Sequence, residues 1–544
     1  MPENFAQLMK QDFADLDSAV ASWKKLADVL GKTQTGSGRR VTGPLHKAGW
    51  TGVSATYGFG AMEATESKLG TARTNVQLIS TTLDALGTKM MAAQRKLRAA
   101  VADAEAAGHR VRDDGWVEGK QAADPAYHND PDYQAVQQRA NAGLGGFRAR
   151  IDEAVDEATR ASTEAAAILR QIDPFDLDKR YGGAHAREDA ARVAVFAGID
   201  VKDLPDGTDP RRTADWWAGL GDEKQRLYLA AFPAEVGALD GLPAVARDQA
   251  NRTALDLRLN DYALREGSLG WHDRYSYRSL TALKDRLDRS DTAPAHKQLY
   301  LLGFDTREDG RAIVSVGNPD TARHTAVSVA GTSNQLDNFG DQISRAEKLQ
   351  EAAGAWNRRR EEDIAVISWL DYDAPEADVD PSRPADLYLN LGIATPGRAE
   401  DDAETLRDFT HGLRAAHQGE RTHMTVIGHS YGSTMVGTGD AGGRGLDTDD
   451  MIVVGSPGLN VDRADQLHVS PSRLWAGAAP DDGVVNWTAD RTLGADPKEP
   501  EFGGRRMYVD TSGHSGYWDD GSESLNNQGR IIADKQPRTP LAHD

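Results

Sequence analysis

The chain has 544 residues, no cysteine and a formal net charge of -21 at pH 7. This length predicts roughly two to four domains, and the charge argues against nucleic acid and anionic membranes as partners, because both would repel the chain. The lack of cysteine excludes disulfides, thiolate metal sites and a cysteine nucleophile.

Motifs for metals, cofactors and membrane insertion are missing. The chain contains no HExxH and no Walker-type GxxxxGK, so we expect neither a metal nor a cofactor. No apolar run approaches the length of a transmembrane segment. The first residues, MPENFAQLMKQDFADL, lack the basic and apolar regions of a Sec signal peptide. We therefore expect a protein that is cytoplasmic or is secreted without such a peptide.

Two long helical patterns occupy residues 1–120. Apolar residues recur at helical spacing over 5–30, and a second pattern of this kind runs to about residue 107. Two amphipathic helices with a short connection predict an antiparallel helical hairpin. Residues 121–290 also have helical patterns and are expected to form a helical linker or middle domain, so that the N-terminal half is all-α.

The connection of the predicted hairpin contains Trp50, Thr51 and Gly52. A Trp-x-Gly between two long helices resembles the WXG100 proteins that type VII secretion systems export. The resemblance implies a helical protein partner for the hairpin and export by a type VII-like route. A generic helical hairpin with a buried Trp50 and a turn glycine is the alternative.

Residues 291–544 alternate short apolar runs with helical patterns. The helical patterns lie at 339–360 and 401–418, and the candidate strands are 312–317, 324–330, 364–370, 423–427, 451–454, 473–476 and 505–510. Strands that alternate with helices predict an α/β domain with a mostly parallel sheet flanked by helices. The first two strands, joined by NPDTAR, predict an antiparallel edge hairpin.

The most specific motif is GHSYG at residues 428–432, which follows an apolar run and precedes a small-residue helical stretch. This order predicts a strand, a sharp turn and a helix with Ser430 at the apex. Such a turn presents the hydroxyl to a base and the next backbone N–H to a developing oxyanion. We expect Ser430 to be a nucleophile, and a merely structural turn is the alternative.

Two further groups follow Ser430 in the chain order of an α/β-hydrolase triad. Asp481 and Asp482 follow one candidate strand, and His514 follows the last one. Loops at the carboxyl ends of parallel strands carry catalytic groups. We expect His514 to be the general base and Asp482 to orient it, with Asp481 as second choice. A surface histidine and a solvated acidic turn are the alternatives.

An oxyanion hole needs a second backbone N–H from the loop after an earlier strand. The strand 324–330 breaks at the sequence GTSN. We expect the N–H of Thr332, or of an immediate neighbour, to act together with that of Tyr431. Ser333 or Asn334 could instead cap the next helix, and both roles are compatible.

Several linked segments resemble one family. They read VSVGNPDTARHTAVSVAGTS, VISWLDYDAP, VIGHSYGS, VVGSPG, FGG and GHSGY. They are similar to the actinobacterial α/β-hydrolases catalogued as the domain of unknown function 1023, over about the last 250 residues. The resemblance implies that Ser430, Asp482 and His514 match the presumed triad of the family. The chain reads AGT where the family more often has a proline before the glycine.

These features predict a serine hydrolase, most simply a carboxylic-ester hydrolase that uses a Ser-His-Asp triad and an acyl-enzyme. The expected substrate is a small-molecule or lipid-like ester, and an amide is less favoured. The alternative function is that of a type VII secretion-linked interaction or scaffold protein, whose hydrolase domain has little or no activity.

Overall fold

We describe the protein from a computed structural model. The structure describes residues 5–37, 41, 53–121, 124–172, 183–358, 360–376, 395–488 and 493–540. The chain divides into two compact units, one of residues 1–34 with 60–200 and one of residues 35–59 with 201–544. The domain boundaries predicted after residues 120 and 290 each fall inside one of these units and remain predictions.

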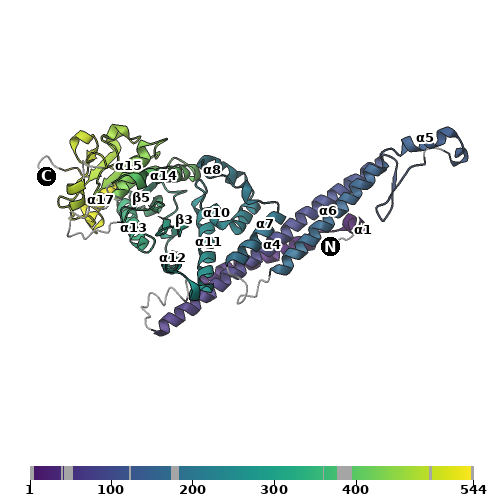
Figure 1. Ribbon diagram of the computed structural model, residues 1–544, viewed down its shortest axis with the longest axis horizontal. Coiled ribbons are helices and arrows are strands. Elements are labelled where there is room, and N and C mark those ends of the chain that lie inside the picture. The colour runs from purple at the N-terminus through teal and green to yellow at the C-terminus, as the bar shows by residue number, and fades with distance from the viewer. Residues whose placement is uncertain are drawn as a thin grey trace. The chain divides into compact units, whose positions relative to one another are not determined.

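The first unit consists mainly of long helices (Figure 1). Lys24 pairs with Asp84, while Gln94, further along the chain, donates to the Leu8 carbonyl, so the two segments run antiparallel. The elements are α1 Phe5–Lys10, α2 Ala14–Ser37, α4 Val53–Ala106, β1 Arg110–Val111, β2 Val117–Glu118, α5 Pro131–Ala140, α6 Leu144–Gln171 and α7 Gly183–Phe196.

An alanine stripe explains how α6 packs in this unit. Ala154, Ala158, Ala161 and Ala165 recur at spacings of three and four residues, which places them on one face of the helix. These small side chains share a core with α4, and Lys96 of α4 pairs with Glu157 of α6 at its edge. The small side chains of α6 therefore pack in one core with larger side chains of α4, such as Met90.

The connection that carries the WXG100 resemblance lies outside the described residues, because Trp50, Thr51 and Gly52 belong to the segment 42–52. The helical partner and the type VII-like route stay predictions. Among the described helices, none combines the length and the hydropathy of a membrane-spanning segment.

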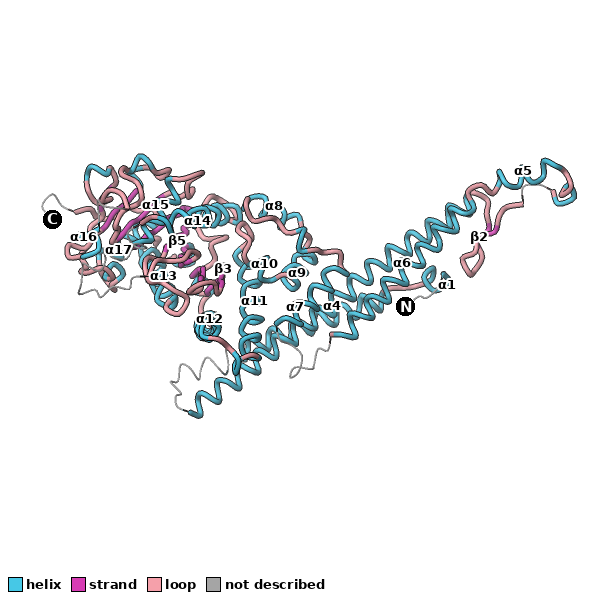
Figure 2. Tube along the Cα trace, in the orientation of Figure 1, coloured by secondary structure: helices cyan, strands magenta, loops and turns pink. Residues whose placement is uncertain are grey.

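The second unit contains an 8-stranded sheet in the order β10-β9-β8-β7-β5-β6-β4-β3, drawn in magenta in Figure 2. The strands from β10 to β6 are parallel, and β4 is antiparallel to both β6 and β3. The strands are β3 Leu299–Asp305, β4 Arg311–Val316, β5 His324–Val329, β6 Ile364–Leu370, β7 His423–His429, β8 Asp450–Val454, β9 Leu474–Gly477 and β10 Arg505–Arg506. The mostly parallel sheet of an α/β domain is confirmed.

The predicted hairpin between residues 312–317 and 324–330 is wrong. β6 lies between β4 and β5, antiparallel to the first and parallel to the second. Every residue of β6 is buried, which suits an interior position in the sheet. The connection after β4 therefore passes the start of β6, where a Cβ on Gly317 (φ 82°) would lie 3.0 Å from the Ile364 carbonyl oxygen.

Two strands differ from the prediction, one because it was not expected and one because it is shorter than expected. β3 was not predicted, because its apolar run LYLLGFD has no alternation and follows directly on a helical region. β10 is shorter than the predicted 505–510. The Met507 N–H still donates to the Ala476 carbonyl of β9. The Tyr508 N–H donates instead to the carbonyl of Arg538 in the C-terminal segment, so the pairing with β9 ends there.

Helices cover both faces of the sheet (Figure 1). α13 packs with α17 on one face, α14 packs with α15 on the other, and α11 packs along β3. Leucines of α12 belong to the same hydrophobic core as the strands. The helices are α8 Pro210–Gly219, α9 Asp222–Ala231, α10 Pro233–Gly237, α11 Ala244–Leu264, α12 Trp271–Ser290, α13 Phe339–Trp356, α14 Gly397–Ala416, α15 Tyr431–Ala441, α16 Gly483–Thr488 and α17 Glu523–Ile532.

A buried carboxylate ties three of the parallel strands together. Asp450, 1% exposed, starts β8 and accepts a hydrogen bond from Trp475 Nε1 of β9 at 2.8 Å. His423 Nε2 of β7 lies 2.9 Å from its other oxygen, which also pairs with Arg473 at 3.0 Å. Burial raises the pKa of Asp450 to about 6, against the opposing effects of Trp475 and Arg473.

We predict that Trp475→Phe lowers the free energy of unfolding by about 2–4 kcal/mol, because it removes the donor to a buried acid and leaves a cavity. The denaturant midpoint of the second unit, followed by fluorescence, measures this. Trp271→Phe is the matched control, since Trp271 is 78% exposed. Equal midpoints for the two variants would contradict the role given to the Asp450 network.

Candidate active site

Ser430 stands at the turn from β7 to α15 with φ 54° and ψ −131°. A positive φ is costly for a residue other than glycine, and it persists only where the surroundings determine it. The Ser430 N–H donates to the Val454 carbonyl at 3.2 Å, and the Ser433 hydroxyl donates to the Ser430 carbonyl at 2.6 Å. The strand, turn and helix predicted around Ser430 are thus present.

Three glycines let the backbone close around this turn. A Cβ on Gly428 would lie 2.5 Å from the Cα of Ser433, and a Cβ on Gly432 would lie 2.5 Å from the Val329 carbonyl oxygen. A Cβ on Gly331 would lie 2.5 Å from the His429 carbonyl oxygen. No side chain fits at these distances, so the sequence GxSxG and the glycine after β5 are required by the packing.

His514 and Asp482 come together as the sequence predicts, from the loops after β9 and β10. His514 Nδ1 lies 3.0 and 2.9 Å from the two carboxylate oxygens of Asp482. Burial alone would raise the pKa of Asp482, but the hydrogen bond and charge of His514, with a bond from Tyr517, hold it below its usual value. Because an ionised carboxylate only accepts, Nδ1 carries the proton and leaves Nε2 free to act as a base.

Two further contacts hold this pair in place. The Tyr517 hydroxyl donates to Asp482 Oδ2 at 2.5 Å and accepts from the Ala479 N–H at 3.1 Å. Burial, followed by the neighbouring carboxylate, raises the pKa of Tyr517 strongly, so it stays a donor. Asp481, the second choice for the acid, does not contact the imidazole. It accepts from the Gly513 N–H at 2.8 Å and so anchors the loop that carries His514.

His429, next to the nucleophile, packs beneath the site. Its Nε2 donates to the His514 carbonyl at 2.8 Å, and the two rings lie 4.7 Å apart. Burial lowers the pKa of His429 well below its usual value, and the neighbouring His514 and Arg345 lower it further. His429 therefore stays neutral and supports the position of His514.

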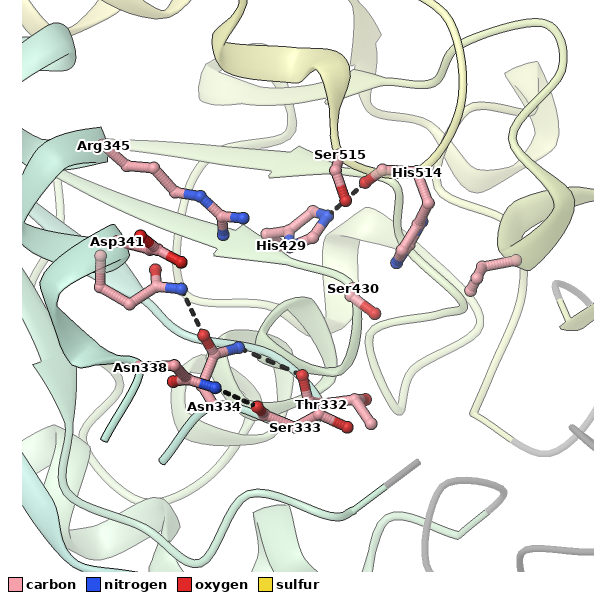
Figure 3. Close-up of a pocket in the computed structure, with 12 residues that line it drawn as sticks. Thr332, Ser333, Asn334, Asn338, Asp341, Arg345, His429, Ser430, His514 and Ser515 are labelled. Atoms are coloured by element: carbon pink, nitrogen blue, oxygen red, sulfur yellow. Dashed lines mark hydrogen bonds between the residues drawn. The ribbon is translucent and has the colours of Figure 1, made fainter. Parts of the chain in front are cut away.

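Ser430 and His514 line one pocket of about 320 Å³. Figure 3 shows the Ser430 hydroxyl and the His514 ring facing each other, although no direct hydrogen bond joins them in the described part of the chain. Such bonds are often long in the absence of substrate and tighten in the complex. Thr332 lines the same pocket.

Backbone hydrogen bonds around Thr332 show which N–H groups are free to donate to an oxyanion. The Ser333 N–H already donates to the Pro375 carbonyl at 3.0 Å. Within the described residues, the N–H groups of Thr332 and Tyr431 have no acceptor. Asn334 does not cap the next helix. Its side chain donates to the Gly331 carbonyl at 2.8 Å and fixes the loop instead.

Sequence reasoning missed several residues of this site. Tyr517 lies in a segment quoted only for its family resemblance, and no local pattern links a tyrosine to a distant acid. Gly455 (φ 58°) follows β8, and a Cβ there would lie 3.0 Å from Asp482 Oδ2 and 3.2 Å from His514 Cε1. Arg345 lines the pocket from α13, whose Ala, Glu and Arg composition indicates only a helix.

Gly455 gives a test that needs no substrate. We predict that Gly455→Ala displaces the imidazole and abolishes the low-field proton NMR signal of the His514–Asp482 hydrogen bond. Gly521→Ala is the matched control, because Gly521 has φ 77° but open space around its Cα. The control carries the same backbone strain, about 1–2 kcal/mol, without the clash. A signal that survives in the Gly455 variant would refute the close packing described here.

Comparisons with known proteins agree with the fold. A family model described as "Alpha/beta hydrolase" matches residues 305–491. The uncharacterized protein Rv2079 of Mycobacterium tuberculosis (strain ATCC 25618 / H37Rv) is 30% identical in a 403-residue alignment that covers 63% of this chain. The match spans 58% of the length of that relative.

Two further proteins are also similar to this chain. The uncharacterized protein Mb0988c of Mycobacterium bovis is 31% identical over 239 residues, covering 42% of this chain and 80% of the relative. The crystal structure of esterase LipW from Mycobacterium marinum has 13% identity and a TM-score of 0.28, over 48% of this chain and 88% of that one. The 31% identity over 80% of Mb0988c shows that the chain belongs to the same family as this relative, and the family match shows that residues 305–491 belong to an α/β hydrolase domain.

Proposed function

We propose that the chain is a serine hydrolase that cleaves a carboxylic ester through an acyl-enzyme on Ser430. The observation that carries the proposal is the His514–Asp482 pair, which faces the same pocket as a serine held at φ 54°. A strained serine, a base with a free nitrogen and an ionised acid are the parts that nucleophilic acyl transfer needs.

The first half of the reaction forms the acyl-enzyme. Ser430 Oγ attacks the ester carbonyl carbon while its proton passes to His514 Nε2. The N–H groups of Thr332 and Tyr431 donate to the oxyanion. The carbon–oxygen bond to the alcohol then breaks, and His514 gives its proton to the leaving oxygen.

The second half releases the acid. A water molecule attacks the acyl carbon, and His514 Nε2 takes its proton. The bond to Ser430 Oγ breaks, the proton returns to Oγ and the carboxylic acid leaves. Throughout, Asp482 stabilises the imidazolium and stays ionised, because its hydrogen bonds keep its pKa low.

The nucleophile is tested directly by labelling with a fluorophosphonate, which reacts with an activated serine regardless of the natural substrate. We predict that the wild-type protein is labelled at Ser430 and that Ser430→Ala loses both the label and the hydrolysis of 4-nitrophenyl acetate. Ser344→Ala, an exposed serine on α13 outside the pocket, should keep both. An unlabelled wild-type protein would overturn the proposal.

The two neighbouring acids should differ sharply. We expect Asp482→Asn to lower kcat by about 10⁴-fold, because an amide at this position favours the wrong imidazole tautomer. Asp481→Asn should cost about tenfold or less, since its amide oxygen still accepts from the Gly513 N–H. Steady-state kinetics on 4-nitrophenyl acetate measures both variants. A larger loss of kcat in Asp481→Asn than in Asp482→Asn would show that Asp482 is not the acid of the triad.

A further inference from the structure

Residues with polar side chains form most of the pocket wall beside Ser430. Of the twelve described residues that line it, Val484 alone has an aliphatic side chain. Pockets for apolar acyl groups are lined mainly by hydrophobic and aromatic side chains. These polar side chains offer hydrogen bonds beside Ser430, which suits a substrate that carries polar groups.

Arg345 is the cation of this wall. It extends from α13 into the pocket toward His429 (Figure 3). Its guanidinium lies 4.4 Å from the ring centroid of Trp518, which orients it from one side. Asp341, one turn earlier on α13, also lines the pocket but is exposed and does not reach ion-pair distance. Among the described residues, no carboxylate pairs with Arg345.

A half-buried guanidinium without a paired anion is costly. Burial lowers the pKa of Arg345, and the nearby charge of Asp341 only partly offsets this. An arginine nevertheless keeps its charge, because its pKa lies far above neutral pH. Ion pairs elsewhere in the same unit show the contrast: Arg286 of α12 pairs with Glu347 at 2.6 Å. The charge of Arg345 is thus available to a ligand in the pocket.

We propose that the pocket selects esters that carry a second, ionised carboxylate, and that Arg345 binds this carboxylate while Ser430 attacks the ester carbonyl. The inference rests on the proposed hydrolase function. A planar guanidinium matches a carboxylate with two parallel hydrogen bonds, and the partly buried position strengthens them relative to water. Arg345 is then a specificity residue, and the rim acid Asp341 disfavours ligands with more extended negative charge.

Matched pairs of esters test the preference. The charged set consists of the 4-nitrophenyl hemiesters of succinate, glutarate and adipate, and the neutral set consists of the same compounds with the free carboxylate as its methyl ester. A second pair, 3-carboxyphenyl acetate and its methyl ester, places the charge on the leaving group. The pairs together locate the side of the ester that faces Arg345.

We expect the wild-type protein to hydrolyse at least one charged ester with a kcat/KM about tenfold to a hundredfold above that of its neutral partner. Arg345→Gln should remove this preference, mainly by raising the KM of the charged esters. Arg345→Lys should keep part of it. Arg286→Gln, the same substitution at a paired arginine outside the pocket, should keep all of it. Equal rates for the charged and neutral members, or a preference that survives in Arg345→Gln, would overturn the inference.

A binding experiment separates this inference from the proposed function. Titration of glutarate into Ser430→Ala needs no turnover, and we expect this variant to bind glutarate. The double variant Ser430→Ala/Arg345→Gln should bind glutarate with a Kd that is about tenfold or more higher. If the wild-type protein is not labelled by a fluorophosphonate, the hydrolase proposal fails, and the titration alone decides on the anion site. If labelling succeeds and glutarate binds both proteins equally, only the anion site fails.

Discussion

The left-handed backbone at Ser430 is the constraint on which the site depends. Such a conformation costs about 1–3 kcal/mol for a residue with a side chain, and here the middle of the sheet enforces it. The Val454 carbonyl of the neighbouring strand β8 accepts a hydrogen bond from the Ser430 N–H. The end of β5 packs so closely against Gly432 that a Cβ on this residue would not fit. The backbone that carries the hydroxyl is therefore held in place before any substrate arrives, as preorganised catalysis requires.

The second requirement is that two distant loops meet above the sheet. The loop after β9 supplies Asp482, and the loop after β10 supplies His514. Asp481 and Tyr517 each bridge these loops, so the geometry does not depend on the single imidazole–carboxylate contact. Gly455 supplies the space beside them. A buried acid that several donors stabilise stays ionised, and this keeps the imidazole in the tautomer that can take a proton.

The sequence predicts the parts of this arrangement that depend on local pattern. Strand runs and the Gly-x-Ser-x-Gly turn are readable because each is set by residues close together in the chain. Asp482 and His514 are readable because each follows a predicted strand in the order of a hydrolase triad. Strand neighbours are not, since β6 enters between β4 and β5 although those two are joined by a short connection. Tyr517 and Arg345 were also out of reach, because their roles arise only where separate elements meet.

In the proposed mechanism, one hydroxyl, one imidazole and two backbone N–H groups surround a single reacting centre. A crystal structure of the protein after reaction with a fluorophosphonate tests this most directly, because the phosphonyl group imitates the tetrahedral intermediate. We predict phosphorus bonded to Ser430 Oγ, its oxygen within hydrogen-bond distance of the Thr332 and Tyr431 N–H groups, and His514 Nε2 beside Oγ. A phosphonyl group on another residue, or an oxygen that faces away from both N–H groups, would contradict the account.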